Sequence, residues 1–180
     1  MTTLRWNTSQ QISRSSCYVK GINCTCTYEN NKVCHVTSLD LSSREFKGQI
    51  DATALASLVH LEEIDLSSNQ LHGSIPVAMG NLRSLTSLDL SYNQLDSSIP
   101  VTMGNLPSLT YLNLSNNQLD GSIPVTMGNL SSLIFLDLSN NQLYGSIPVT
   151  MGNLRTCLHS SLLICPKINF MVASLFTHLS

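Results

Sequence analysis

The sequence predicts an α/β repeat solenoid, a right-handed superhelix with a parallel β-sheet on its concave side and mostly strand and loop elsewhere. Three observations predict it: the chain matches itself at a shift of 24 residues, leucines alternate with polar residues in each repeat, and Asn, Gly and Pro recur at fixed places between the strands. One such repeat cannot bury its own apolar edge, so repeats of this length stack side by side. A chain of 180 residues is expected to form one such domain.

The repeat is visible as columns of identical residues. Leucines occupy two columns, Leu66, Leu90, Leu114 and Leu138, then Leu71, Leu95, Leu119 and Leu143. A third column is Asn69, Asn93, Asn117 and Asn141. Each of these repeats then carries Ile-Pro, followed by Met-Gly-Asn-Leu ending at Leu82, Leu106, Leu130 and Leu154. Chance does not produce this many coinciding columns.

Each strand is predicted from the alternation of its side chains. In Leu88-Asp89-Leu90 both leucines point to one side of an extended chain, and Ser87, Asp89 and Ser91 point to the other. The leucines therefore form the core. The strands of successive coils are expected to line up as the parallel concave sheet.

The chain leaves each strand through a turn that contains the Asn column. A buried amide there is expected to satisfy the backbone groups of the turn, because each unpaired group costs about 1–3 kcal/mol. Beyond it, in Leu119-Asp120-Gly121-Ser122-Ile123-Pro124, Gly permits an unusual backbone angle and Pro removes a donor. Any second strand pairing in this segment must therefore be short and edge-like.

The pattern L-x-G-x-I-P followed by x-x-x-G-N-L resembles the plant-specific class of extracellular leucine-rich repeats, over residues 36–156 or about five coils. In that family such stacks form ectodomains of receptor-like kinases and receptor-like proteins, and also secreted inhibitors of cell-wall polygalacturonases. The chain departs from the pattern at Ser97, where other coils have Gly, and in the first coil, from Leu39 through Gly48 and Ile50, which lacks the Pro and has one extra residue. We interpret residues 1–35 as an incomplete N-terminal cap and residues 157–180 as a tail outside the repeat.

The cysteines lie only at the two ends of the repeat region: Cys17, Cys24, Cys26 and Cys34 before it, and Cys157 and Cys165 after it. The segment Cys17-Tyr-Val-Lys-Gly-Ile-Asn-Cys24 resembles the family's cap pattern C-x-W-x-G-V-x-C, with Val19 at the Trp position. The resemblance implies a Cys17–Cys24 disulfide first and a Cys26–Cys34 disulfide second, although four cysteines allow three pairings. The rival interpretation is a zinc site that includes His35, but its ligand spacing matches no common pattern, so no metal is predicted.

The repeat stops abruptly after Leu154. A further coil would place Leu, Asn and Ile-Pro where the chain has Ser160, Cys165, Met171 and Val172. Two interpretations stay open, a truncated or misread gene product and a tail that folds over the last coil. The apolar stretch 162–176 is shorter than the ~20 residues of a membrane helix, so no span is predicted in this chain. The first residues lack the apolar segment of a signal peptide, which we interpret as a missing 5′ end.

The composition argues against several function classes. Charged residues make up only 11% of the chain, and a formal net charge of −2 leaves no basic stripe for nucleic acid. No phosphate-binding loop, nucleophile elbow or H-E-x-x-H helix occurs, and the histidines are scattered, with His60, His72 and His159 at variable positions of the coil where no catalytic role is expected. We therefore predict a binding protein that is not an enzyme and uses no cofactor.

The outward side chains of the concave strands are expected to form columns across the coils. The first column is Ser38, Glu63, Ser87, Tyr111 and Phe135, the second is Asp40, Asp65, Asp89, Asn113 and Asp137, and the third is all Ser. Tyr111 and Phe135 would be neighbours about 4.8 Å apart, with Tyr92 at a strand end nearby. Stacked aromatics are typical interface anchors, although ordinary cross-strand packing would give the same pair. The predicted ligand-binding residues are Glu63, Asp89, Tyr92, Tyr111, Phe135 and Asp137.

Three sequons are predicted glycosylation sites, at Asn7, Asn113 and Asn129. A fourth, at Asn23, adjoins a predicted disulfide and is less suited. The repeat's own Asn and Ser columns also generate such triplets by coincidence.

The family resemblance implies the ligand-recognising part of a receptor-like protein or kinase, outside the cell or on the outer face of the plasma membrane. Its partner would be a peptide, glycan or protein ligand, or a co-receptor ectodomain. Two alternatives stay open: a secreted inhibitor of a cell-wall polygalacturonase and a truncated product without function.

Overall fold

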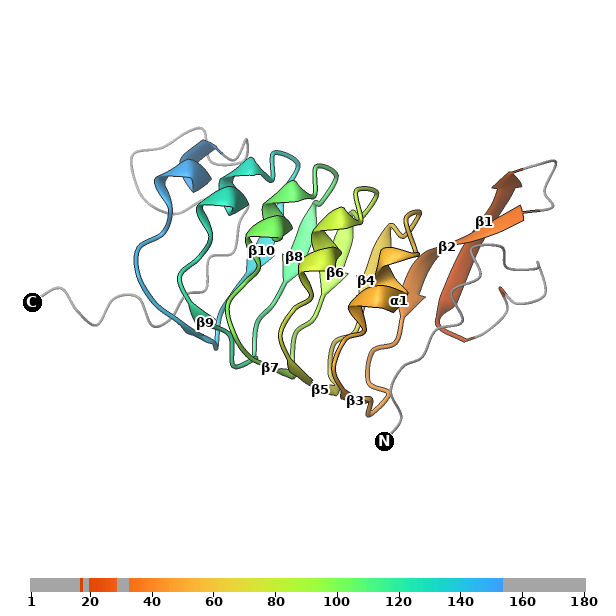
Figure 1. Cartoon of the computed structure of the whole chain (residues 1–180), viewed down its shortest axis with the longest axis horizontal. Helices are drawn as coiled ribbons and strands as arrows, with labels where there is room; N and C mark the ends of the chain where they lie inside the picture. The colour runs from red at the N-terminus through yellow and green to blue at the C-terminus, as the bar shows by residue number, and fades with distance from the viewer. Residues whose placement is uncertain (1–16, 18–19, 29–32, 154–180) are drawn as a thin grey trace, which may run out of the picture.

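The computed structural model describes residues 17, 20–28 and 33–153. Successive coils stack along one axis, so that their helical turns follow one another in a row and their strands form the sheet behind them (Figure 1). The predicted repeat solenoid with a parallel sheet is confirmed. Within the described ranges, no helix has the length and apolar character that a membrane crossing needs.

The main sheet has six strands in the order β1-β2-β4-β6-β8-β10. Their bounds are β1 Ile22–Tyr28, β2 Val33–Asp40, β4 Glu63–Asp65, β6 Ser87–Asp89, β8 Tyr111–Asn113 and β10 Phe135–Asp137. The first pair is antiparallel, and every later pair is parallel. Leu88 lies opposite Leu112, which lies opposite Leu136, so equivalent positions of the repeat face each other. These leucines are buried, and each contributes about 1.5–3 kcal/mol by leaving water.

The Asn column joins each coil to the one before it. Asn117 accepts a hydrogen bond from the Leu95 backbone N–H at 3.0 Å and donates one to the Leu90 carbonyl at 2.9 Å, both in the preceding coil. Asn69, Asn93 and Asn141 make equivalent bonds. The buried amide that the sequence predicted is therefore present, and it connects two coils besides closing its own turn.

Short strands line the far side of each coil, as the Gly and Pro positions predicted. They are β3 Lys47–Gly48, β5 Gln70–Gly73, β7 Gln94–Leu95, β9 Asp120–Gly121 and β11 Gln142–Leu143. They form two sheets, β3-β5-β7 and β9-β11, and one isolated bridge joins Ser98 to Asp120 between them. The interruption falls beside Ser97, which adopts a φ of +66° where Gly73 and Gly121 have +80° and +79°. A side chain in this left-handed region costs about 1–2 kcal/mol.

A helical turn closes each coil. The later coils use the 3-10 helices η2 Val77–Asn81, η3 Val101–Asn105, η4 Val125–Asn129 and η5 Val149–Asn153. The first coil, which lacks the Pro, instead has the α-helix α1, Ala52–Ala56. The Asp51 carboxylate caps it by accepting hydrogen bonds from the backbone N–H groups of Thr53 and Ala54.

The glycine of Met-Gly-Asn-Leu sets the distance between helical turns. A Cβ on Gly104 would overlap the Thr126 carbonyl of the next coil, and Gly80 and Gly128 face the next threonine in the same way. Thr126 in turn donates its hydroxyl to the Val101 carbonyl at 2.7 Å. Glycine is therefore required for this close approach between coils.

The antiparallel pair of β1 and β2 lies at the N-terminal end of the main sheet, with the disulfides Cys17–Cys24 and Cys26–Cys34 beside it. These are the two pairs that the cap resemblance implied. Because all four sulfurs are in disulfides, the rival zinc site would have no thiolate ligand.

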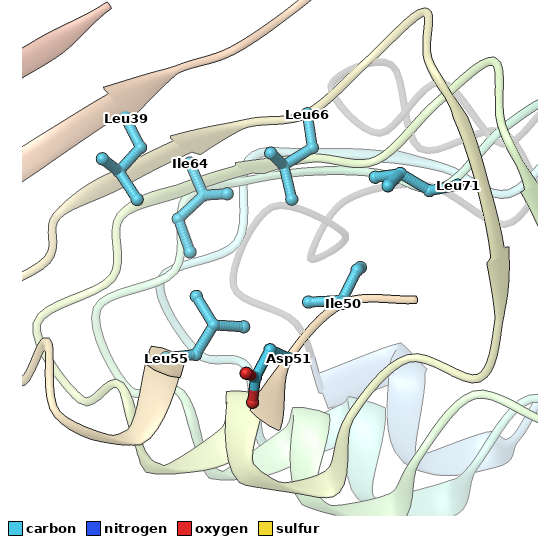
Figure 2. A pocket seen from close by; sticks show the side chains of 7 residues that line it. All are labelled: Leu39, Ile50, Asp51, Leu55, Ile64, Leu66 and Leu71. Carbon is cyan, nitrogen blue, oxygen red and sulfur yellow. The ribbon is translucent and has the colours of Figure 1, made fainter. Parts of the chain in front are cut away.

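A small apolar cavity lies between α1 and the main sheet (Figure 2). It is lined by Leu39, Ile50, Asp51, Leu55, Ile64, Leu66 and Leu71. Its volume of about 20 Å³ has room for about one water molecule. This cavity is therefore too small for a ligand larger than water.

Candidate functional site

The parallel register places the concave side chains in the two columns that the sequence predicted. The first runs Ser38, Glu63, Ser87, Tyr111, Phe135, and the second runs Asp40, Asp65, Asp89, Asn113, Asp137. We call these two columns the concave surface. It crosses β2, β4, β6, β8 and β10.

Tyr111 and Phe135 stack on each other in the first column. Their ring centroids are 4.5 Å apart and their planes differ by 7°. Both side chains are half-buried, so the pair offers apolar area with a polar edge.

Tyr92 lies elsewhere on the coil. It follows Ser91 in the turn beyond β6, with a φ of +54°, and its side chain is 60% exposed. Ser87, five residues earlier, is the register neighbour of Tyr111. The structure therefore brings Tyr111 and Phe135 together but sets Tyr92 at the other end of the strand.

A polar network connects the aromatic pair to the acidic column. The Tyr111 hydroxyl donates to Asp89 Oδ2 at 3.2 Å, and Asn113 Nδ2 donates to the same oxygen at 3.2 Å. Burial, together with the negative charge of Asp89, raises the pKa of Tyr111 above its ordinary value. The phenol therefore stays protonated and keeps donating at neutral pH.

The Asp/Asn column also has a structural task. Oδ1 of Asp89 accepts hydrogen bonds from the backbone N–H and hydroxyl of Ser91, at 2.9 and 2.6 Å. In the same way, Asp65 and Asp137 each accept a hydrogen bond from the backbone N–H of the serine two residues later in the chain. These hydrogen bonds close the turn after each strand. One oxygen of each carboxylate is therefore committed to the fold.

The third column differs from the expectation. Its later members, Ser91, Ser115 and Ser139, were expected to face outward but are only 3%, 3% and 8% exposed, whereas Ser42 and Ser67 of the same column are half-buried. The reason is that the chain turns away from the strand at these residues, and the preceding Asp or Asn side chain folds onto them. The concave surface therefore has two columns.

The concave surface is strongly acidic. Five of the chain's eleven acidic residues lie in its two columns, whereas none of the nine lysines and arginines does. These carboxylates are Asp40, Glu63, Asp65, Asp89 and Asp137. The arrangement favours a partner that carries positive charge.

The predicted glycosylation sites differ in their surroundings. Asn129 is exposed at the end of η4. Asn113 is half-buried, and its amide nitrogen already donates to Asp89. Asn7 lies outside the described residues. Asn129 therefore offers the more accessible acceptor of the two described.

The sequence analysis missed one pair of side chains. The rings of His35, in β2, and His60, before β4, lie 3.9 Å apart between centroids. Burial, followed by the charge of His60, lowers the pKa of His35. The one-coil separation of the two histidines could have indicated the contact.

The comparisons with known proteins agree with this architecture. A family model described as a leucine-rich repeat region matches residues 14–156. The chain belongs to the leucine-rich repeat family. It is 37% identical over 70 residues to a probable leucine-rich-repeat receptor-like serine/threonine-protein kinase of Arabidopsis thaliana, an alignment that covers 39% of this chain and 7% of the kinase. The chain thus spans only a small part of the curated relatives that it matches.

Solved leucine-rich repeat structures are similar over much more of the chain. A chain of the BIR3–SERK2 complex from Arabidopsis thaliana is 37% identical with a TM-score of 0.68, over 77% of this chain and 73% of that one. A chain of the Arabidopsis receptor kinase HAESA in complex with the peptide hormone IDA and the co-receptor SERK1 is 31% identical with a TM-score of 0.66, over 84% and 29%. A plant ice-binding protein is 32% identical with a TM-score of 0.69, over 77% and 43%. These three structures therefore share the repeat-solenoid fold of this chain.

Proposed function

We propose that the chain is a ligand-recognising portion of a plant receptor-like protein or receptor-like kinase and acts outside the cell by binding rather than by catalysis. Its partner is a peptide, glycan or protein, or the ectodomain of a co-receptor. The similarity to ectodomains in complexes with a peptide hormone and with co-receptors supports this class of partner. The partner binds the concave surface around Tyr111, Phe135, Asp89 and Asp137.

The observation that carries the proposal is the Tyr111–Phe135 stack on an otherwise small and polar sheet face. The pair lies in two adjacent strands of a register-locked sheet, so both rings are held in place before a partner arrives. Rigid aromatic side chains supply contact area at little conformational entropy, which is why they are frequent anchors of binding sites.

A peptide library displayed on phage, selected against the purified secreted protein, tests the proposal. Selected binders are then measured against the Tyr111→Ala/Phe135→Ala double variant, which should weaken binding by at least about tenfold, as expected for loss of an anchor. Tyr144→Ala, which removes an exposed tyrosine beside β11 on the far side of the coil, is the matched control. Equal affinities for the double variant and the control would place the site elsewhere. The SERK2 ectodomain serves as a second probe for the co-receptor class.

A second candidate function is ice binding. One valine per coil is exposed at the same place in four coils, with 67% exposure for Val77, 64% for Val101, 66% for Val125 and 92% for Val149. This regular apolar row along the 3-10 helices, together with the similarity to a plant ice-binding protein, favours the candidate. Ice recrystallisation is measured with and without the protein. Recrystallisation that the protein slows, and that the Val101→Lys/Val125→Lys variant no longer slows, would support ice binding. An equal rate with and without the protein would exclude it.

A further inference from the structure

We infer that Ser87 is the floor of a subsite for an arginine side chain, so that the partner of the concave surface is a basic peptide segment. The inference rests on the proposed function and specifies its ligand. It follows from the two register neighbours of Ser87, Glu63 and Tyr111, and from Asp65 and Asp89, which face each other two residues further along β4 and β6.

Ser87 makes a notch in the first column. Its register neighbours are Glu63 on β4 and Tyr111 on β8. Neighbouring strands are about 4.8 Å apart, so the two larger residues stand roughly 10 Å apart across the serine. A planar side chain has room to enter between them.

One wall of the notch is an aromatic face. Tyr111 lies on β8, between Ser87 on β6 and Phe135 on β10. Phe135 stacks on one face of the Tyr111 ring from the β10 side. The other face of the Tyr111 ring is therefore turned towards Ser87. The Tyr111 hydroxyl, bound to Asp89, holds the ring in this orientation. Guanidinium groups bind such faces within about 6 Å of the ring centroid.

The remaining walls are negatively charged. Glu63 is exposed and, unlike the aspartates of the second column, does not close a turn. Asp65 and Asp89 lie opposite each other beside the notch, and the negative charges of both raise the pKa of Tyr111. Asp65 accepts the hydrogen bond of its turn through Oδ1, as Asp89 does, so the turn of Asp65 does not use its Oδ2. No lysine or arginine of the chain occupies the two columns to neutralise this charge.

Arginine fits this arrangement better than lysine. Its guanidinium stacks on an aromatic face while its edge N–H groups reach carboxylates in the same plane, whereas an ammonium ion is more strongly hydrated and has no flat face. Like charges in adjacent strands also repel, so a bound cation relieves repulsion among Glu63, Asp65 and Asp89. The chemistry therefore selects a peptide with an arginine opposite Ser87 and an apolar residue beside it on Phe135.

The test uses N-acetyl-arginine-N-methylamide as a probe, titrated into the isotope-labelled 180-residue chain and followed by NMR chemical shifts. Saturable shifts at the backbone amides around Ser87 and Tyr111 are expected. The citrulline analogue, which keeps the shape but lacks the charge, should bind at least about tenfold more weakly, because it loses its charge-assisted bonds. Unsaturable shifts scattered over the surface, or equal affinity for citrulline, would overturn the inference.

Variants localise the effect. Ser87→Val fills the notch and should weaken the arginine probe at least about fivefold by displacing the guanidinium from the ring. Ser74→Val makes the same change at an exposed serine directly after β5, on the far side of the coil, and should leave the affinity unchanged. Equal effects of both variants would contradict the subsite. If phage-selected peptides need Tyr111 and Phe135 but tolerate Ser87→Val, the arginine subsite is wrong while the concave ligand site stands.

Discussion

Replacing Asn117 by Ala tests how far the stability of the solenoid depends on contacts between coils. The Asn117 side chain is 9% exposed and makes four hydrogen bonds. It accepts from the Leu95 N–H at 3.0 Å and donates to the carbonyls of Leu90, Leu114 and Ser115 at 2.9, 3.2 and 3.2 Å. The substitution removes all four at once.

These bonds do not contribute equally. The three carbonyls keep other donors after the substitution, because Asn93 also binds Leu90, Asn141 binds Leu114, and the Tyr92 N–H binds Ser115. The Leu95 N–H, by contrast, loses the side-chain acceptor that lies against it. Leaving one buried donor unsatisfied costs about 1–3 kcal/mol, and this sets the expected destabilisation of Asn117→Ala.

Equilibrium urea unfolding, followed by circular dichroism, measures this free energy. Asn105→Ala is the matched control, because Asn105 is an exposed amide at the end of η3 and should change stability by less than about 0.5 kcal/mol. If Asn117→Ala and Asn105→Ala destabilise the protein equally, the Asn column is solvated and the reasoning is refuted.

Three further predictions follow from particular residues. Ser97→Gly should stabilise the fold by up to about 1 kcal/mol, because relief of the left-handed strain exceeds the entropy cost of glycine; a loss of stability in urea unfolding would contradict it. Gly104→Ala should cost about 1–3 kcal/mol or more by forcing the coils apart. In contrast, Gly152→Ala, which meets no described atom within 4 Å, should be nearly neutral; similar losses in both would show that coil spacing is not the cause. The raised pKa of Tyr111 stabilises the fold below the ordinary tyrosine value of about 10, and this contribution is lost as pH rises through the folded value. Tyr111→Phe should therefore remove a phenol that ionises above the ordinary tyrosine value in an alkaline absorbance titration, and an unchanged titration would count against the burial of Tyr111.

The columns of the concave surface were predictable because the repeat fixes the register. A shift by one residue would turn every leucine of a strand outward, so the leucine pattern alone places Tyr111 beside Phe135. The short strands of the far side followed from Gly and Pro for a similar reason, since both restrict the backbone whatever surrounds them.

The differences arise where the chain leaves the strand. The alternation in the sequence continues through Ser91 and Ser115, but the backbone turns there and the side chains become buried. Tyr92 belongs to the same turn, which separates it from the aromatic pair. The hydrogen bond from the Tyr111 hydroxyl to Asp89 runs diagonally between adjacent coils. It was not predictable, because the orientation of the Tyr111 ring depends on the packing of its neighbours rather than on sequence spacing. Residues 154–180, with Cys157 and Cys165, lie outside the described residues, so the predicted tail keeps its two interpretations.

Hydroxyl-radical footprinting of the protein with its best phage-selected peptide measures the central claim most directly, because it reports the solvent exposure of individual side chains. Recognition by the concave surface predicts that the peptide protects Tyr111 and Phe135 from oxidation. Tyr144, on the far side of the coil, and Val125, on the helical side, should stay as reactive as in the protein alone. Protection of Val125 or Tyr144 with unchanged oxidation of Tyr111 and Phe135 would contradict the account.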